Sequence, residues 1–193
     1  MQSIHNSEHI HPLLAQRWSP VIFDAQREVS ESDMQSLMQA ARWAPSCFNA
    51  QPWRFVIGSR SRQPDTWQKI HAVLVEGNQG WTQAAPVLML GVTQLHFEHN
   101  GKPNAHAAYD LGAAAAHLTF EASARGLLVH QMAGLDPDKA AEVFALDEGL
   151  RVMTAWAIGY HGDAAQAEAS LREREAQERQ RKPLDELVLA GGL

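Results

Sequence analysis

Three segments hold residues whose types could do chemistry. The most distinctive runs from Ala44 to Phe55 and combines Asn49 and Gln51 with two prolines and several aromatic residues. A rigid polar loop of this kind can present amides to a flat heterocycle. The other two segments are basic, Arg17 to Pro20 near the N-terminus and Arg179 to Leu184 near the C-terminus. Each basic segment is typical of a solvated surface when taken alone.

A reactive cysteine and a metal site are both disfavoured. Cys47 follows a predicted helix C-terminus, where the helix dipole opposes the thiolate, so we interpret it as a passive residue. Histidines gather at 5–11 and 96–106, but no cysteine lies near them and their spacing matches no tetrahedral zinc pattern. We therefore predict no metal. The chain also lacks a G-x-G-x-x-G motif, a Walker loop, H-E-x-x-H and paired C-x-x-C motifs, which argues against a separate nucleotide-binding domain.

The composition is that of an ordinary globular domain. The chain has 193 residues, of which 45% are hydrophobic and 20% charged, enough for one core without disulfides. A net charge of -6 favours neither nucleic acid nor an anionic membrane as a partner. With one cysteine, no secretory signal in residues 1–12 and no apolar run near the roughly 20 residues of a membrane span, we predict a cytoplasmic protein.

Helices and strands alternate along the chain. The first strong helix begins at Ser30, where Ser30 and Asp33 form an S-x-x-D cap signal, and Pro45 ends it. Periodicity and breakers predict further helices over 64–76, 104–125 and 137–146, and strands over 53–57, 87–92, 127–132 and 152–160. The charged stretch 164–182 is expected to be a solvated helix or an extended arm, and 187–189 a terminal strand. This pattern favours an α/β or α+β sandwich, with a strand order that periodicity alone does not give.

The sequence resembles the nitroreductase family of FMN enzymes from about Arg17 to Leu187. The most specific match is the stretch A-R-W-A-P-S-x-x-N-x-Q-P-W-R-F at 41–55. Weaker matches are the segments 78–86, 109–114, 126–134, 158–160 and 181–184. The resemblance implies an α+β fold, a three-layer α/β/α sandwich with a mixed, mostly antiparallel sheet. It also implies a homodimer with both FMN sites at the interface. We expect a flexible tail at 1–14 and a single domain at 15–193, whose C-terminal arm (about 163–193) is solvated or reaches over the partner.

The resemblance also assigns residues to the cofactor. Arg17, Ser19 and Arg181 match the positions that hold the FMN phosphate, with Arg179 as a helper and Trp18 between the first two. A phosphate dianion is well bound by guanidinium groups and a hydroxyl. The remaining matches surround the flavin ring and ribityl chain: Pro45, Ser46, Asn49 and Gln51 in the loop, Asn78 near the ring, and Met132, Ala133 and Gly134 in a turn whose amides point at flavin N5 and O4.

One position departs from the family pattern. The family commonly has R-x-S-x-R or R-x-S-x-K at the start, and here the last position is Val21. A reduced flavin carries negative charge near N1, so losing a nearby cation should disfavour its reduction. We expect weaker FMN retention or a lower potential than in relatives, and we expect Val21→Arg to raise one or both.

The resemblance implies an oxidoreductase with NADH or NADPH as transient reductant. FMN would take a hydride and pass the electrons to a nitroaromatic, a quinone or an enal in a ping-pong sequence, and no residue argues for a protein acid or base. Dehydrogenation or reductive dehalogenation on the same fold is one alternative, with 98–105 and 146–151 as candidate lid segments. A flavin-binding or storage protein without enzymatic activity is another, and a dimeric partner-binding protein without flavin is a third.

Overall fold

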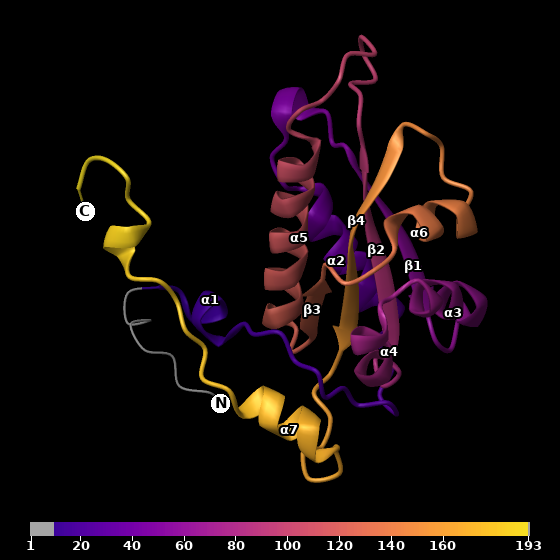
Figure 1. The fold of residues 1–193 in the computed structure, drawn as a ribbon, viewed down its shortest axis with the longest axis vertical. Coiled ribbons are helices and arrows are strands. Elements are labelled where there is room, and N and C mark those ends of the chain that lie inside the picture. Colours follow the sequence, from indigo (N-terminus) through magenta and orange to yellow (C-terminus); the bar gives the residue numbers. More distant parts are fainter. Residues whose placement is uncertain (1–9, 193) are drawn as a thin grey trace.

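The computed structural model describes residues 10–192 and shows one antiparallel sheet between two layers of helices (Figure 1). The strand order is β1-β2-β4-β3, and all three pairings are antiparallel. The strands are β1 (Trp53–Ser59), β2 (Val87–Gln94), β3 (Leu128–Met132) and β4 (Leu150–Gly159). The α+β sandwich predicted from the sequence is confirmed.

Helices α2 (Glu31–Arg42) and α5 (Ala107–Ala124) cover one face of the sheet. Leu37 of α2 and Leu118 of α5 are completely buried and pack with Trp156 of β4 in one apolar cluster. The predicted cap at Ser30 is confirmed, because its Oγ accepts a hydrogen bond from the Asp33 N–H at 3.0 Å. On this side of the sheet, α5 packs against α2 and against strands β1, β2 and β3.

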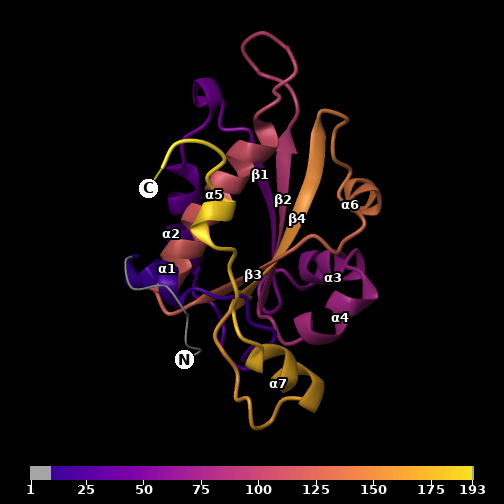
Figure 2. The same ribbon diagram turned by 60° about the vertical axis from the view of Figure 1, so that its left-hand side comes forward.

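Helices α3 (Pro64–Ala72), α4 (Glu76–Thr82) and α6 (Pro137–Val143) lie on the other face (Figure 2). Ile70 of α3 packs there with Leu88 and Leu90 of β2. Gly58 of β1 lets α3 approach closely, since a Cβ at this position would lie 2.4 Å from the Trp67 backbone nitrogen. Both faces of β2 are buried, as its continuous apolar run predicts.

The sheet has one irregularity, between Gly91 and Val92 of β2. Gly91 faces Thr154, whereas Val92 faces Val152, so Met153 is left unpaired. This β-bulge reverses the inward-facing parity of β4 from that point on. The bulge explains why Val152 and Ala155, three positions apart, both face the core cluster on the α3 side of the sheet.

Two secondary-structure predictions are wrong. The helix expected over 64–76 ends at Ala72 and a second helix begins at Glu76, because the chain turns at 73–75, where Leu74 forms an antiparallel bridge with Leu135. The strand expected over 187–189 is absent, since the chain forms a 3-10 helix at Leu184–Glu186 and Leu189 is 98% exposed, with no sheet edge beside it. Of the charged stretch 164–182, only α7 (Ala169–Ala176) is an α-helix.

The N-terminal and C-terminal segments of the described chain run side by side next to α5. The short helix α1 (Pro12–Gln16) contacts α5, and the segment after α7 runs beside α1 (Figure 1). α1 takes up the end of the expected tail, and residues 1–9 lie outside the described residues. Within 10–192, no helix is long and apolar enough to cross a membrane.

Candidate functional site

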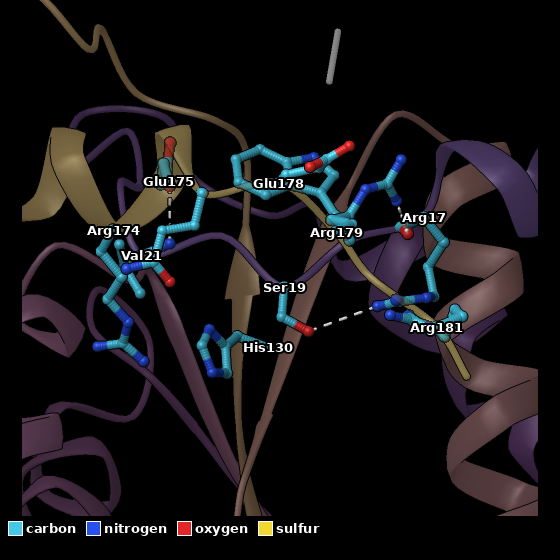
Figure 3. Close-up of a pocket in the computed structure, with 11 residues that line it drawn as sticks. Arg17, Ser19, Val21, His130, Arg174, Glu175, Glu178, Arg179 and Arg181 are labelled. Atoms are coloured by element: carbon cyan, nitrogen blue, oxygen red, sulfur yellow. Dashed lines mark hydrogen bonds between the residues drawn. The ribbon is translucent and has the colours of Figure 1, made fainter. Parts of the chain in front are cut away.

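A pocket of about 300 Å³ opens where the two ends of the chain meet (Figure 3). Three elements form it: the segment after α1, strand β3, and α7 with the chain that follows it. The lining residues are Arg17, Trp18, Ser19, Val21, His130, Arg174, Glu175, Gln177, Glu178, Arg179 and Arg181. The fold thus brings together both basic segments that the sequence singled out.

Four arginines and two glutamates line this pocket, so positive charge predominates in it. The Arg17 guanidinium donates to Ser19 Oγ at 3.4 Å. Burial lowers the pKa of Arg17, and the charges of Arg181 and Arg179 lower it further. Like charges held together and partly removed from water are stabilised by an anion placed among them. The pocket therefore favours a multiply charged anion such as a phosphate.

Arg179 ties the two chain ends to each other. Its guanidinium donates to the Arg17 carbonyl at 2.7 Å and to the Ala15 carbonyl at 3.0 Å, which serves the C-terminal end of α1. Burial, followed by the charge of Arg181, lowers the pKa of Arg179. Two of its donors are thus committed to the backbone, so Arg179 positions Arg17 more than it reaches into the pocket.

Glu175 fixes α7 to the same subunit. Its Oε1 accepts hydrogen bonds from the backbone N–H groups of Val21 at 2.7 Å and Ile22 at 2.8 Å, and its Oε2 lies 2.8 Å from His161 Nε2. Hydrogen bonds to a charged group are about twice as strong as neutral ones. The first half of the arm, up to α7, therefore packs on the chain's own 20–22 segment.

His130 lines the arginine pocket and packs against Trp81, which lines the neighbouring larger groove, and sequence reasoning assigned neither to the site. Their ring centroids lie 4.5 Å apart, and His130 Nδ1 lies 2.6 Å from the Pro20 carbonyl oxygen. A carbonyl only accepts, so Nδ1 carries the proton. The alternation of β3 places His130 on the α4 side, which the sequence could have indicated only with the sheet order in hand.

Asn78 and the turn after β3 lie on the same side of the sheet as Trp81, and neither lines the arginine pocket. Asn78 Nδ2 donates to the Gly134 carbonyl at 2.9 Å, and Asn78 lies one helical turn before Trp81 on α4. A Cβ at Gly134 would lie 2.5 Å from Asn78 Nδ2, so the turn needs glycine here. Thr154 Oγ1 anchors the turn by donating to the Met132 carbonyl at 3.0 Å. Asn78 and the 132–134 turn are therefore neighbours in the structure.

The predicted loop at 45–51 lies elsewhere in the same chain. Ser46 Oγ accepts from the Gln51 N–H at 3.0 Å, and the Cys47 N–H donates to Asp110 at the start of α5 at 3.1 Å. α5 has 18 residues, about 27 Å at 1.5 Å per residue. The segments after α1 and after α7, which line the arginine pocket, lie near the other end of α5 (Figure 1). One chain therefore keeps the loop and the pocket apart.

Backbone strain marks this loop. Phe48, Asn49 and Gln51 have φ values of 53°, 54° and 47°, a left-handed conformation that costs non-glycine residues about 1 kcal/mol or more each. Phe48 is 83% exposed and contacts the ring of Phe97 edge-on, with centroids 5.9 Å apart. Strain held by fixed hydrogen bonds is typical of a binding loop.

Other candidate chemistries gain no support. Cys47 is half-buried, and within 10–192 no group of three or more His, Cys, Asp or Glu side chains is arranged to hold a metal ion. His5 and His9 of the first histidine group lie outside the described residues.

Val21, which replaces the basic residue common in the family, is part of the hydrophobic core. Its side chain is 2% exposed and belongs to the core cluster under α3 and α4, although it also borders the pocket. An arginine at this position would have to displace core residues, so Val21→Arg is a poor way to restore a cation here. The same pocket contains Arg174, a cation that the sequence pattern did not indicate.

Comparison with known proteins decides the family. The sequence model of the Nitroreductase family matches residues 14–160. The chain belongs to the nitroreductase family. A 15.4 kDa protein from the ask 5′ region of Mycolicibacterium smegmatis is 32% identical over 144 residues, covering 72% of this chain and 95% of that protein. The major NAD(P)H-flavin oxidoreductase of Aliivibrio fischeri is 25% identical over 211 residues, with 83% and 93% covered.

Solved structures of the family have the same fold. An oxidoreductase containing FMN matches with a TM-score of 0.91 and 32% identity, covering 100% of this chain and 96% of that one. A nitroreductase from Desulfovibrio desulfuricans in complex with FMN matches with a TM-score of 0.73 and 23% identity, covering 95% and 99%. The predicted family and fold are confirmed, and with them the prediction that this nitroreductase-family chain is an oxidoreductase.

The environment of His130 predicts a pH effect on stability. Burial lowers its pKa, the hydrogen bond to Pro20 opposes this, and the charge of Arg174 lowers the pKa again. The unfolded imidazole takes up its proton near pH 6.5 and the folded one only at lower pH. Between the pKa of the folded state and that of the unfolded state, the unfolded chain binds more protons. The free energy of unfolding therefore falls as the pH falls, by at most about 1.4 kcal/mol per pH unit.

We expect His130→Gln to remove this component, because glutamine can donate to the Pro20 carbonyl without titrating. Chemical denaturation of both proteins between pH 7.5 and 5.5 measures it. The free energy of unfolding of the wild type should fall more steeply than that of His130→Gln, and parallel curves would contradict the assignment.

Proposed function

We propose that the chain is an FMN-dependent oxidoreductase that uses NADH or NADPH to reduce nitroaromatic, quinone or enal substrates. The observation that carries the proposal is the pocket in which Arg17, Ser19 and Arg181 converge from opposite ends of the chain. Their guanidinium and hydroxyl donors fit a phosphate dianion. Arg17, partly removed from water and beside two like charges, is the residue that such an anion would stabilise most.

The residues beyond the phosphate donors suit the rest of the cofactor. The buried Trp81 ring supports the imidazole of His130, and the side chain of Asn78 braces the turn that contains Met132, Ala133 and Gly134. The backbone amides of this turn and the Asn78 side chain would face the flavin ring. Glycine at 134 keeps the turn close to α4, so the ring would meet backbone donors with few degrees of freedom.

We further propose that the site is completed by a second copy of the chain. The loop residues Pro45, Ser46, Asn49 and Gln51 lie about the length of α5 from the pocket, too far for one subunit to apply both to one flavin. A homodimer with two-fold symmetry gives each pocket the loop of its partner. In such a dimer the strained loop at 45–51 would contact the ligand, and strained backbone is typical of binding loops.

The chemistry would belong to the cofactor. When bound, FMN can accept a hydride from a nicotinamide and pass electrons on to an oxidised substrate in a ping-pong sequence. The residues of this chain would bind the phosphate and orient the ring, and none is assigned as an acid or base. NADH or NADPH as reductant is supported by the activity named for the Aliivibrio fischeri relative. We also propose that the protein acts in the cytoplasm.

An anaerobic flavin titration tests the activity. We expect the purified protein, supplied with FMN, to lose the flavin absorbance near about 450 nm when NADH or NADPH is added, and to recover it when a nitroaromatic or a quinone follows. Bound flavin that neither nucleotide bleaches would contradict the proposed reductant and support a storage role or other flavin chemistry. A protein that binds no FMN would contradict the proposal as a whole and favour a partner-binding role.

Mixing two damaged homodimers tests the shared site. Arg17→Ala damages the phosphate pocket and Asn49→Ala damages the loop, so a heterodimer of the two has one intact site and one with both defects. With random exchange, half of the dimers are heterodimers, and about a quarter of the wild-type flavin sites should be restored.

Flavin retained after subunit exchange and gel filtration measures this recovery. Arg17→Ala mixed with itself is the control. No recovery above the two separate variants, despite proven exchange, would contradict completion by a partner loop.

A further inference from the structure

A fourth arginine faces the pocket from the side opposite the phosphate donors. Arg174 lies on α7, beside Val21 and His130, whereas Arg17 and Arg181 lie across the pocket (Figure 3). It also borders a larger groove of about 890 Å³ between α4, the 21–26 segment and the start of the arm. Arg174 therefore sits where the two cavities join.

The side chain of Arg174 is held near the ring of Trp81. Its guanidinium carbon lies 5.7 Å from the Trp81 ring centroid, within the range of a cation–π contact. Among residues 10–192, Arg174 forms no salt bridge within 4.0 Å, unlike Arg54, Arg62 and Arg125. Its charge therefore acts on the pocket without a carboxylate bound to it.

The position of α7 is fixed relative to Val21. The residue after Arg174 is Glu175, whose carboxylate accepts the backbone N–H groups of Val21 and Ile22 at 2.7 and 2.8 Å. α7 is thus bound to the segment where the family pattern has a basic residue and this chain has a buried valine. The chain thus lacks a cation at position 21 and has one at Arg174 of α7, which lines the same pocket.

We propose that Arg174 takes over the role of the basic residue absent at position 21 and stabilises the negative charge of reduced FMN. The inference rests on the proposed function, because it requires FMN in the pocket. A reduced flavin carries one more negative charge, near N1, than the oxidised form, and a nearby cation binds it more tightly. Arg174 therefore strengthens binding of reduced FMN more than of oxidised FMN.

Three variants of α7 separate charge from structure. Arg174→Met removes the charge and keeps an apolar stem, and Arg174→Lys keeps the charge. Arg172→Met is the matched control, since Arg172 is exposed on the same helix and does not line the pocket. The dissociation constant of oxidised FMN and the midpoint potential of the bound flavin are measured for each variant and for the wild type.

We expect Arg174→Met to lose about tenfold of the preference for reduced FMN, which corresponds to a midpoint potential about 30 mV lower for a two-electron couple. Arg174→Lys should retain most of the wild-type potential, and Arg172→Met should match the wild type. A potential for Arg174→Met equal to that of Arg172→Met overturns the inference. An equal loss of affinity for both redox forms also overturns it and places Arg174 at the phosphate. A wild type without FMN affinity contradicts the proposed function instead.

Discussion

The structure depends on holding several guanidinium groups together in a partly buried pocket. Arg17 lies near one end of the chain and Arg181 near the other, and burial and the charges of Arg181 and Arg179 lower the pKa of Arg17. Repulsion of this kind has to be offset by the fold when no anion is present. Two anchors do so: Arg179 binds the backbone of 15–17, and Glu175 binds the backbone of 21–22. Both anchors come from the C-terminal arm, so the arm is part of the site.

The same constraint explains how the site is divided. α5 separates the arginine pocket from the strained loop at 45–51, and each is rigid within one chain. A molecule long enough to need both must meet them on two subunits. Rigid halves that meet only in the assembled dimer would bind a flat cofactor with little loss of backbone freedom. The fold of one chain therefore requires a dimer if a single ligand is to contact both the pocket and the loop.

Local rules predicted the elements whose signals lie within a few residues. The Ser30 cap fixed the start of α2, and the apolar run of β2 indicated a strand buried on both faces. The site was predictable in part, through the pattern that contains Asn49 and the basic segments. His130 and Arg174 were missed because their place depends on the sheet order and on the path of the arm, which no local pattern encodes. The split of the 64–76 helix has a similar cause, since the bridge at Leu74 is a contact with a distant residue.

The most direct test of the account is the affinity of the wild-type protein for FMN compared with riboflavin, which lacks only the phosphate. Charge-assisted hydrogen bonds contribute about 1.5–3 kcal/mol each, so two arginines should favour FMN by about a hundredfold or more. Fluorescence titration of both flavins measures the ratio. A preference of this size, reduced by added inorganic phosphate, is the predicted result. Equal affinities for FMN and riboflavin would contradict the claim that the arginine pocket holds the phosphate.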